Sequence, residues 1–139
     1  MWGNVTRATR SLTSAILTHC GDHPAHRDNA IRWTGAFCVA TMHFIRREYH
    51  IPTAELAGFL KRQELDPLDN AEHQSLYVAS QIRYYLRKAL KVDAKTPVQI
   101  AHARTIHMQY MSGLIDVLIE QVSGMERIRS TPLPVVYTS

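Results

Sequence analysis

Apolar residues recur at intervals of three and four along most of the chain, a spacing typical of amphipathic helices. The first helix is expected over residues 2–19, with Val5, Leu12, Ala15 and Ile16 on one face. The segment Gly21–Pro24 should end it, and Asp28 or Asn29 should cap the second helix. The apolar stripe predicted for this second helix consists of Ile31, Gly35, Cys38, Met42, Ile45 and Tyr49.

The middle of the chain predicts two further helices. Thr53 should cap a short helix, with apolar side chains at Leu56, Phe59 and Leu60. The segment Asp66–Asp69 contains Pro67 and is expected to be a turn. A longer helix follows over residues 71–91, with its apolar face at Leu76, Ala79, Ile82, Leu86 and Leu90.

The last helix is expected over residues 97–129, with Pro97 at its first position. It has two adjacent stripes, which predict a helix that is covered on more than one side. The first stripe consists of Met108, Met111, Ile115, Leu118, Val122 and Met125. The second consists of His107, Tyr110, Leu114, Val117, Gln121, Gly124 and Ile128.

These patterns predict an all-α fold, a bundle of four to five helices in a single domain over residues 1–139. No segment alternates with a period of two, and no internal repeat is present. With 139 residues, 45% of them apolar, the chain is long enough for a hydrophobic core. Two cysteines do not make a disulfide framework, so we expect a reducing compartment. No stretch reaches the roughly 18 apolar residues that span a bilayer, and we expect no signal peptide.

The candidate metal ligands are His19, Cys20, His23 and His26. Zinc takes four such ligands in a tetrahedron. Gly21 and Pro24 interrupt the helix that would align them, however, and a polar loop with neutral histidines is the favoured interpretation. We therefore predict no metal and no cofactor.

The acidic and basic residues of the chain do not indicate catalysis or nucleic-acid binding. Asp116, Glu120 and Glu126 form an acidic row without a partner for acid–base catalysis, and no nucleophile or phosphate-loop motif is present, so we expect no enzyme. A net charge of +4 allows an anionic partner. Basic residues and tyrosines lie close together between residues 77 and 95, but no nucleic-acid motif accompanies them, and we expect no nucleic acid as partner.

The C-terminal fifteen residues do not look like the end of a domain. Pro132 and Pro134 should stop the last helix, because neither donates a backbone N–H and each restricts the residue before it. An apolar run at residues 133–137 then begins as the sequence ends. We expect a charged helix end, a proline bend, and the start of an apolar segment that continues elsewhere.

This stretch resembles the bestrophin family of membrane ion channels, in which a similar motif joins a cytosolic helix to a transmembrane helix. The residues that carry the resemblance are Glu126, Arg127, Ile128, Thr131, Pro132, Leu133, Pro134 and Tyr137. Two weaker similarities lie upstream in the same order. They are Trp2-Gly3 followed by Arg7 and Arg10, and the segment 75–78.

The resemblance implies a subunit fragment of a homopentameric channel for chloride or other small anions. This segment would lie on the cytosolic or stromal side of a membrane that is reached through flanking helices. The family has a pore aperture on this last helix, about six turns before the motif tyrosine, which places the candidate at Ile115. A core position for Ile115, and a soluble helical scaffold that binds a protein partner, remain the alternatives.

Overall fold

A computed structural model describes residues 2–45, 56 and 58–130, and within these ranges the chain is entirely helical, without strands. The elements are α1 (Trp2–His19), α2 (Pro24–Ile45), α4 (Arg62–Asp69), α5 (Gln74–Ala89) and α6 (Val98–Ser130). The predicted all-α class with one long C-terminal helix is confirmed.

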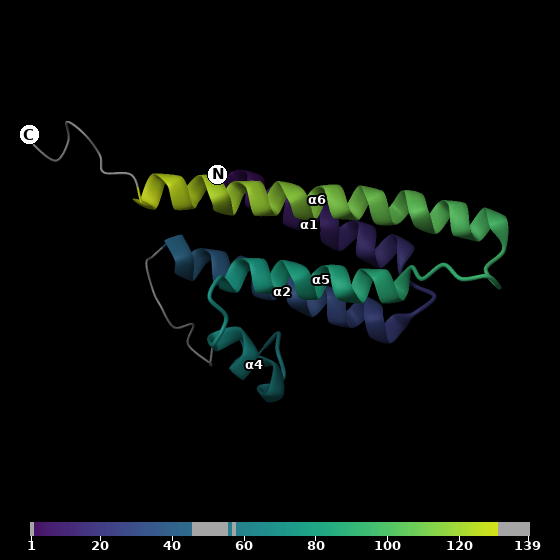
Figure 1. Cartoon of the computed structure of the whole chain (residues 1–139), viewed down its shortest axis with the longest axis horizontal. Coiled ribbons are helices and arrows are strands. Elements are labelled where there is room, and N and C mark those ends of the chain that lie inside the picture. Colours follow the sequence, from purple (N-terminus) through teal and green to yellow (C-terminus); the bar gives the residue numbers. More distant parts are fainter. Residues whose placement is uncertain (1, 46–55, 57, 131–139) are drawn as a thin grey trace, which may run out of the picture.

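Four of the helices form an up-down-up-down bundle (Figure 1). α1 packs along α6, α2 packs along α5, and α4 lies beside the α2–α5 pair. Contacts fix the antiparallel directions. The amide of Asn4 reaches Gln121 at 3.4 Å near the start of α1, whereas the ring of His19 at its end meets that of His107. One end of the bundle therefore carries the start of α1 and the end of α6, and the opposite end carries the α1–α2 turn.

α1 follows its predicted bounds. Its buried residues are spaced by three and four, so the sequence alone predicts its buried face correctly. They are Val5, Ala8, Leu12, Ala15 and Ile16. Its threonines donate hydrogen bonds to the backbone one turn earlier, such as Thr9 to the Val5 carbonyl at 2.7 Å. This arrangement satisfies hydroxyls that would otherwise lie unpaired at the half-buried edge.

The predicted start of α2 at Asp28 or Asn29 is wrong. α2 begins at Pro24, because proline suits the first turn of a helix, where no N–H is required. The predicted stripe is also wrong. The fully buried residues of α2 lie on a different side of the helix, and the small residues among them let neighbouring helices approach. Its members are Ala30, Trp33, Thr34, Ala36, Phe37, Ala40 and Thr41.

The predicted turn at Asp66–Asp69 is wrong as well, since these residues complete α4 with Pro67 inside it. The Glu64 carboxylate accepts a hydrogen bond from the Lys61 backbone N–H at 2.7 Å and thereby stabilises the start of the helix. Arg32 of α2 holds α4 in place, donating to both oxygens of Glu64 at 2.8 and 3.2 Å and to the Phe59 carbonyl at 2.7 Å. The short helix predicted from Thr53 lies largely outside the described residues.

α5 is shorter at both ends than predicted, and α6 matches its prediction within a residue. The turn between them is built on Asp93, whose carboxylate accepts hydrogen bonds from the Lys95 N–H at 2.9 Å and the Thr96 hydroxyl at 3.1 Å. These bonds lower the pKa of Asp93, and Pro97 then leads into α6. The first predicted stripe of α6 is confirmed as core. Its fully buried members are Met111, Ile115, Leu118, Val122 and Met125.

Among residues 2–45, 56 and 58–130, no helix combines the length and the apolar character needed to cross a membrane.

Candidate functional site

The C-terminal motif is only partly described. Glu126 and Arg127 lie in the last turns of α6, and the side chain of Ile128 lies outside the described residues. Thr131, Pro132, Pro134 and Tyr137 lie outside them entirely. Ser130 is the last helical residue that the structure describes, so the expectation that the first proline of the motif ends the helix stays a prediction.

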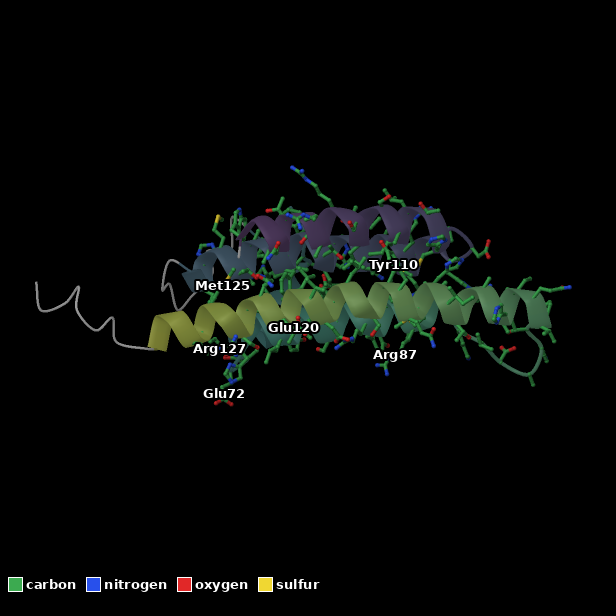
Figure 2. The ribbon with its side chains drawn as sticks, turned by 90° about the horizontal axis from the view of Figure 1, so that it is seen from above. Glu72, Arg87, Tyr110, Glu120, Met125 and Arg127 are labelled. Atoms are coloured by element: carbon green, nitrogen blue, oxygen red, sulfur yellow. The ribbon has the colours of Figure 1, made fainter. Side chains whose placement is uncertain are left out.

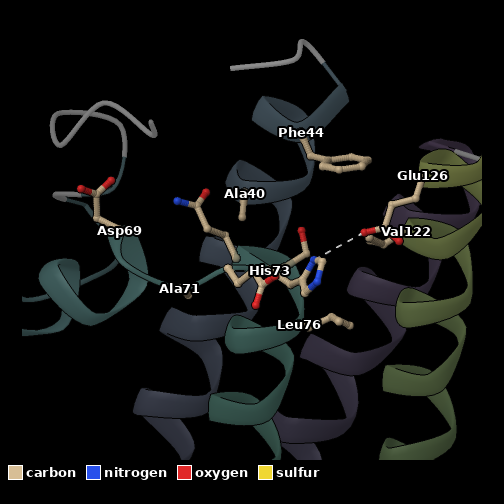
Figure 3. Close-up of a pocket in the computed structure, with 11 residues that line it drawn as sticks. Ala40, Phe44, Asp69, Ala71, His73, Leu76, Val122 and Glu126 are labelled. Atoms are coloured by element: carbon tan, nitrogen blue, oxygen red, sulfur yellow. Dashed lines mark ion pairs between the residues drawn. The ribbon is translucent and has the colours of Figure 1, made fainter. Parts of the chain in front are cut away.

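Glu126 opens onto a cavity of about 240 Å³ at this end of the bundle (Figure 3). Its polar lining comes from the end of α4, the segment between α4 and α5, and α6. The cavity, which we call the acidic pocket, is lined by Ala40, Phe44, Asp69, Ala71, Glu72, His73, Gln74, Ser75, Leu76, Val122 and Glu126. Nδ1 of His73 lies 3.8 Å from a carboxylate oxygen of Glu126, the ion pair drawn in Figure 3. Three carboxylates and one imidazole give this pocket an acidic character.

A second hollow runs between α1 and α6 on the outside of the bundle. This outer groove, of about 520 Å³, is lined by Arg10, Ser11, Ser14, Ala15, Thr18, His19 and Tyr110. Figure 2 shows Tyr110 on the side of α6 that faces α1, and Arg87 on the opposite side. The groove is lined by hydroxyls, a guanidinium and an imidazole, and no carboxylate is among the described residues that line it.

The rings of His19 and His107 stack at the far end of the outer groove. Their centroids are 3.6 Å apart and their planes differ by 12°. Burial lowers the pKa of His19, and the positive charge of a protonated His107 lowers it further. Two charged rings in contact would repel, so the stack disfavours positive charge on both rings at once.

The remaining members of the predicted metal cluster do not converge with His19. The rings of His23 and His26 lie 6.1 Å apart, and buried Nδ1 of His26 has no hydrogen-bond partner among the described residues. Burial raises the pKa of the Cys20 thiol to about 11, although Arg27 opposes the shift, so the thiol stays protonated. Within the described part of the chain, no three histidine, cysteine or acidic side chains are grouped to hold a metal ion.

The two stripes of α6 differ in exposure. Ile115, the candidate aperture residue, has 0% of its surface exposed and packs in the core of its own bundle. On the second stripe, Val117 is 36% exposed and Tyr110 is 54% exposed. These two positions of the second stripe are open to solvent, and the aperture role of Ile115 stays a prediction.

The basic and aromatic residues of α5 are occupied by local contacts. Arg83 forms an ion pair with Asp116 of α6, and Nζ of Lys88 lies 4.7 Å from the centroid of the Tyr84 ring. These charged side chains therefore belong to a solvated helix face, and their partners lie on the same helix and on α6.

Sequence reasoning missed both the outer groove and the acidic pocket. One signal was available for the groove, because Arg10, Ser14 and Thr18 are spaced by four and share a face of the first helix. The partners across each hollow, Tyr110 for the groove and Glu126 for the pocket, depend on how α6 is aligned with its neighbours. No local pattern encodes that alignment.

Comparison with known proteins supplies a family. A family model described as Bacterial/Fungal Bestrophin protein matches residues 1–139. The solved structure of a bacterial bestrophin homolog from Klebsiella pneumoniae, carrying an Ile-to-Thr mutation, matches with a TM-score of 0.75 and 24% sequence identity. The match covers 99% of this chain and 48% of that one, so the chain spans about half the length of its structural relative. No curated protein matches the sequence.

Proposed function

The chain belongs to the bacterial and fungal bestrophin family, and we propose that it is the extramembrane helical part, residues 1–139, of one subunit of an anion channel. The observation that carries the proposal is the family match along all 139 residues. The bundle itself supports it, because its fold is that of a bacterial bestrophin homolog. We assign no catalytic role, and the described residues suggest no cofactor.

The distribution of charge supports an anion as the transported ion. The end of the bundle farthest from the C-terminal motif carries basic side chains around the α5–α6 turn. They are Arg87, Lys88, Lys91, Lys95 and Arg104. Asp93 and Asp22, which pairs with Arg104, offset part of this charge, and the remaining basic side chains, together with a net charge of +4 for the whole chain, favour small anions such as chloride.

The motif at the end of α6 supports a position next to a membrane on its cytosolic or stromal side. α6 runs to Ser130, and the sequence continues with two prolines and an apolar run. Since the chain spans about half of its structural relative, the other half of a full-length protein would supply the membrane helices. The paired prolines would then turn the chain from α6 into the bilayer.

We propose that five copies surround a common axis, with the exposed stripe of α6 at the interface or along the ion path. A closed ring of identical subunits places the same helix face toward its neighbour in every copy. Two members of this stripe, Tyr110 and Val117, and the neighbouring Ile106 are exposed apolar side chains that the bundle itself leaves uncovered. A ring of apolar side chains can act as a constriction that gates by losing water.

The test is conduction by the full-length protein in planar lipid bilayers, together with its mass in detergent. We expect chloride current and a mass of five subunits. Val117→Ala should change conductance or ion preference with little loss of stability, because its side chain is 36% exposed. Ile115→Ala serves as the matched comparison on the same helix.

A change in ion preference for Ile115→Ala, with normal folding, would support the family position of the aperture. It would also require Ile115 to leave the core in the assembled channel. A full-length protein that is monomeric and carries no current would overturn the channel proposal and favour a helical scaffold.

A further inference from the structure

The outer groove between α1 and α6 contains donors of hydrogen bonds and positive charge without a negative partner. Arg10 lines it, and none of the carboxylates in the described part of the chain lies along it. Arg10 is exposed and takes part in no ion pair among the described residues. This is unlike Arg32, Arg83 and Arg104, each of which has a carboxylate partner.

Hydroxyls complete the lining of the groove. Those of Ser11, Ser14 and Tyr110 form no hydrogen bond to described residues, so their O–H groups can turn toward a ligand. Thr18 donates to the Ser14 carbonyl at 2.7 Å and offers only acceptor capacity. Guanidinium and hydroxyl donors around a volume of about 520 Å³ are chemically suited to a hydrated or partly dehydrated anion.

One ring of the stacked histidine pair, that of His19, lines this groove. A neutral His19 adds no charge to the groove, but protonation of either ring would place a cation there. The charged groups near the pair do not supply a compensating negative charge. Asp22, in the α1–α2 turn, lies 3.6 Å from Arg104 of α6. His23 and His26, at the start of α2, are imidazoles themselves, and Arg27 beside them pairs with Asp28 at 3.0 Å.

We propose that the outer groove binds a small inorganic anion between Arg10, Ser14 and Tyr110, and that the bound anion favours protonation of the His19–His107 pair. The coupling is reciprocal, because an anion that stabilises the protonated pair must bind more tightly when the pair is protonated. The choice of chloride as the first probe rests on the proposed function. That the groove binds an anion is inferred from the residues that line it, and this does not depend on the proposed function.

The experiment is a pH titration of the histidine side chains by NMR on the full 139-residue chain. Sodium chloride and sodium sulfate are compared with sodium gluconate, a larger organic anion used as the reference, at a common ionic strength of roughly 0.15 M. We expect the titration midpoint of His19 to rise by about half a pH unit in chloride or sulfate. His19→Gln assigns the signal.

Arg10→Gln should abolish the rise, and Ser14→Ala should reduce it. Arg7→Gln is the matched control. It removes an exposed arginine from the same helix, but Arg7 does not line the groove, so the rise should persist. Circular dichroism checks that each variant is folded, and Ser14→Ala remains informative if Arg10→Gln fails to fold.

A midpoint that is the same in all three salts would overturn the proposal. An equal rise in the wild type and in folded Arg10→Gln would do so too, because it would reflect general screening. A rise in sulfate alone would support an oxyanion site. This measurement needs no current, so a full-length protein that carries no chloride current but keeps the midpoint shift would overturn the channel and leave the groove intact.

Discussion

The two ends of the bundle both contain ion pairs, but only the end with the α1–α2 turn also contains a stacked pair of histidines among the described residues. At the end near the C-terminal motif, the imidazole of His73 lies 3.8 Å from the carboxylate of Glu126, and the neighbouring α4 is held by the ion pair of Glu64 with Arg32. At the opposite end, His19 and His107 stack directly on one another. The Glu64–Arg32 pair is stabilised by the attraction of opposite charges, whereas two positive charges on the stacked rings would repel each other.

This difference predicts two separate responses to acid. Burial alone would raise the pKa of Glu64, but the hydrogen bonds from Arg32 and from the Lys61 backbone outweigh it, so the pKa is lowered. The pKa of His19 is lowered as well, by burial and by His107. A lowered pKa in the folded state means that stability is lost as the pH falls, first for the histidine and then for the carboxyl group.

The largest expected effect is at the paired carboxylate. Arg32→Ala should lower the free energy of unfolding by about 2 kcal/mol, because it removes hydrogen bonds from a charged donor and leaves the mostly buried Glu64 without its partner. Urea denaturation measures the change.

Arg27→Ala is the control on the same helix. Arg27 forms an ion pair with Asp28 at 3.0 Å, but the Asp28 side chain is largely exposed. This change should cost no more than about 0.5 kcal/mol. Equal losses for the two variants would show that α4 does not depend on Arg32 for its attachment.

The difference between α1 and α2 explains how much of the fold the sequence could predict. α1 has one face of regularly spaced apolar side chains and α6 has two adjacent stripes of them, and both helices were predicted with nearly correct bounds. In α2, apolar residues surround the helix, and the buried face includes Ala30, Ala36 and Ala40. Which face is buried depends on where the neighbouring helices can pack most closely. The spacing of apolar residues in the sequence does not contain that information, and it predicted the wrong face.

α4 was missed for a different reason. Pro67 signals a turn in an isolated sequence, but α4 begins at Arg62 and accommodates the ring near its end. The contacts of Arg32 with Glu64 and the Phe59 carbonyl join residues about 30 positions apart, and they stabilise a helix that the local sequence does not favour. The stack of His19 with His107 also joins distant parts of the chain, so the local sequence does not predict it.

The next effect concerns the pH dependence of stability. The wild type should be most stable above pH 6.5, the ordinary value for histidine, and lose stability as the pH falls below it, because the unfolded chain takes up a proton that folded His19 resists. A second loss should begin below about pH 4.5, where Glu64 is protonated in the unfolded state first. Urea denaturation at a series of pH values, from neutral to below 4.5, measures both losses of stability.

Two variants separate the two losses. His107→Leu removes the ring whose charge acts on His19, so the first loss should shrink while the second remains. Arg32→Ala should shrink only the second. If His107→Leu leaves the whole loss near pH 6.5 in place, the stacked pair is not its source.

The smallest effect is expected at the acidic pocket. His73 lies 3.8 Å from Glu126, with 58% and 42% of the two side chains exposed, so solvent and salt screen the pair (Figure 3). His73→Ala should therefore change the free energy of unfolding by no more than about 0.5 kcal/mol, and less at high salt. Urea denaturation at low and high sodium chloride provides the measurement. A loss as large as that of Arg32→Ala would show that charge pairing at the motif end is as important to the fold as it is at α4.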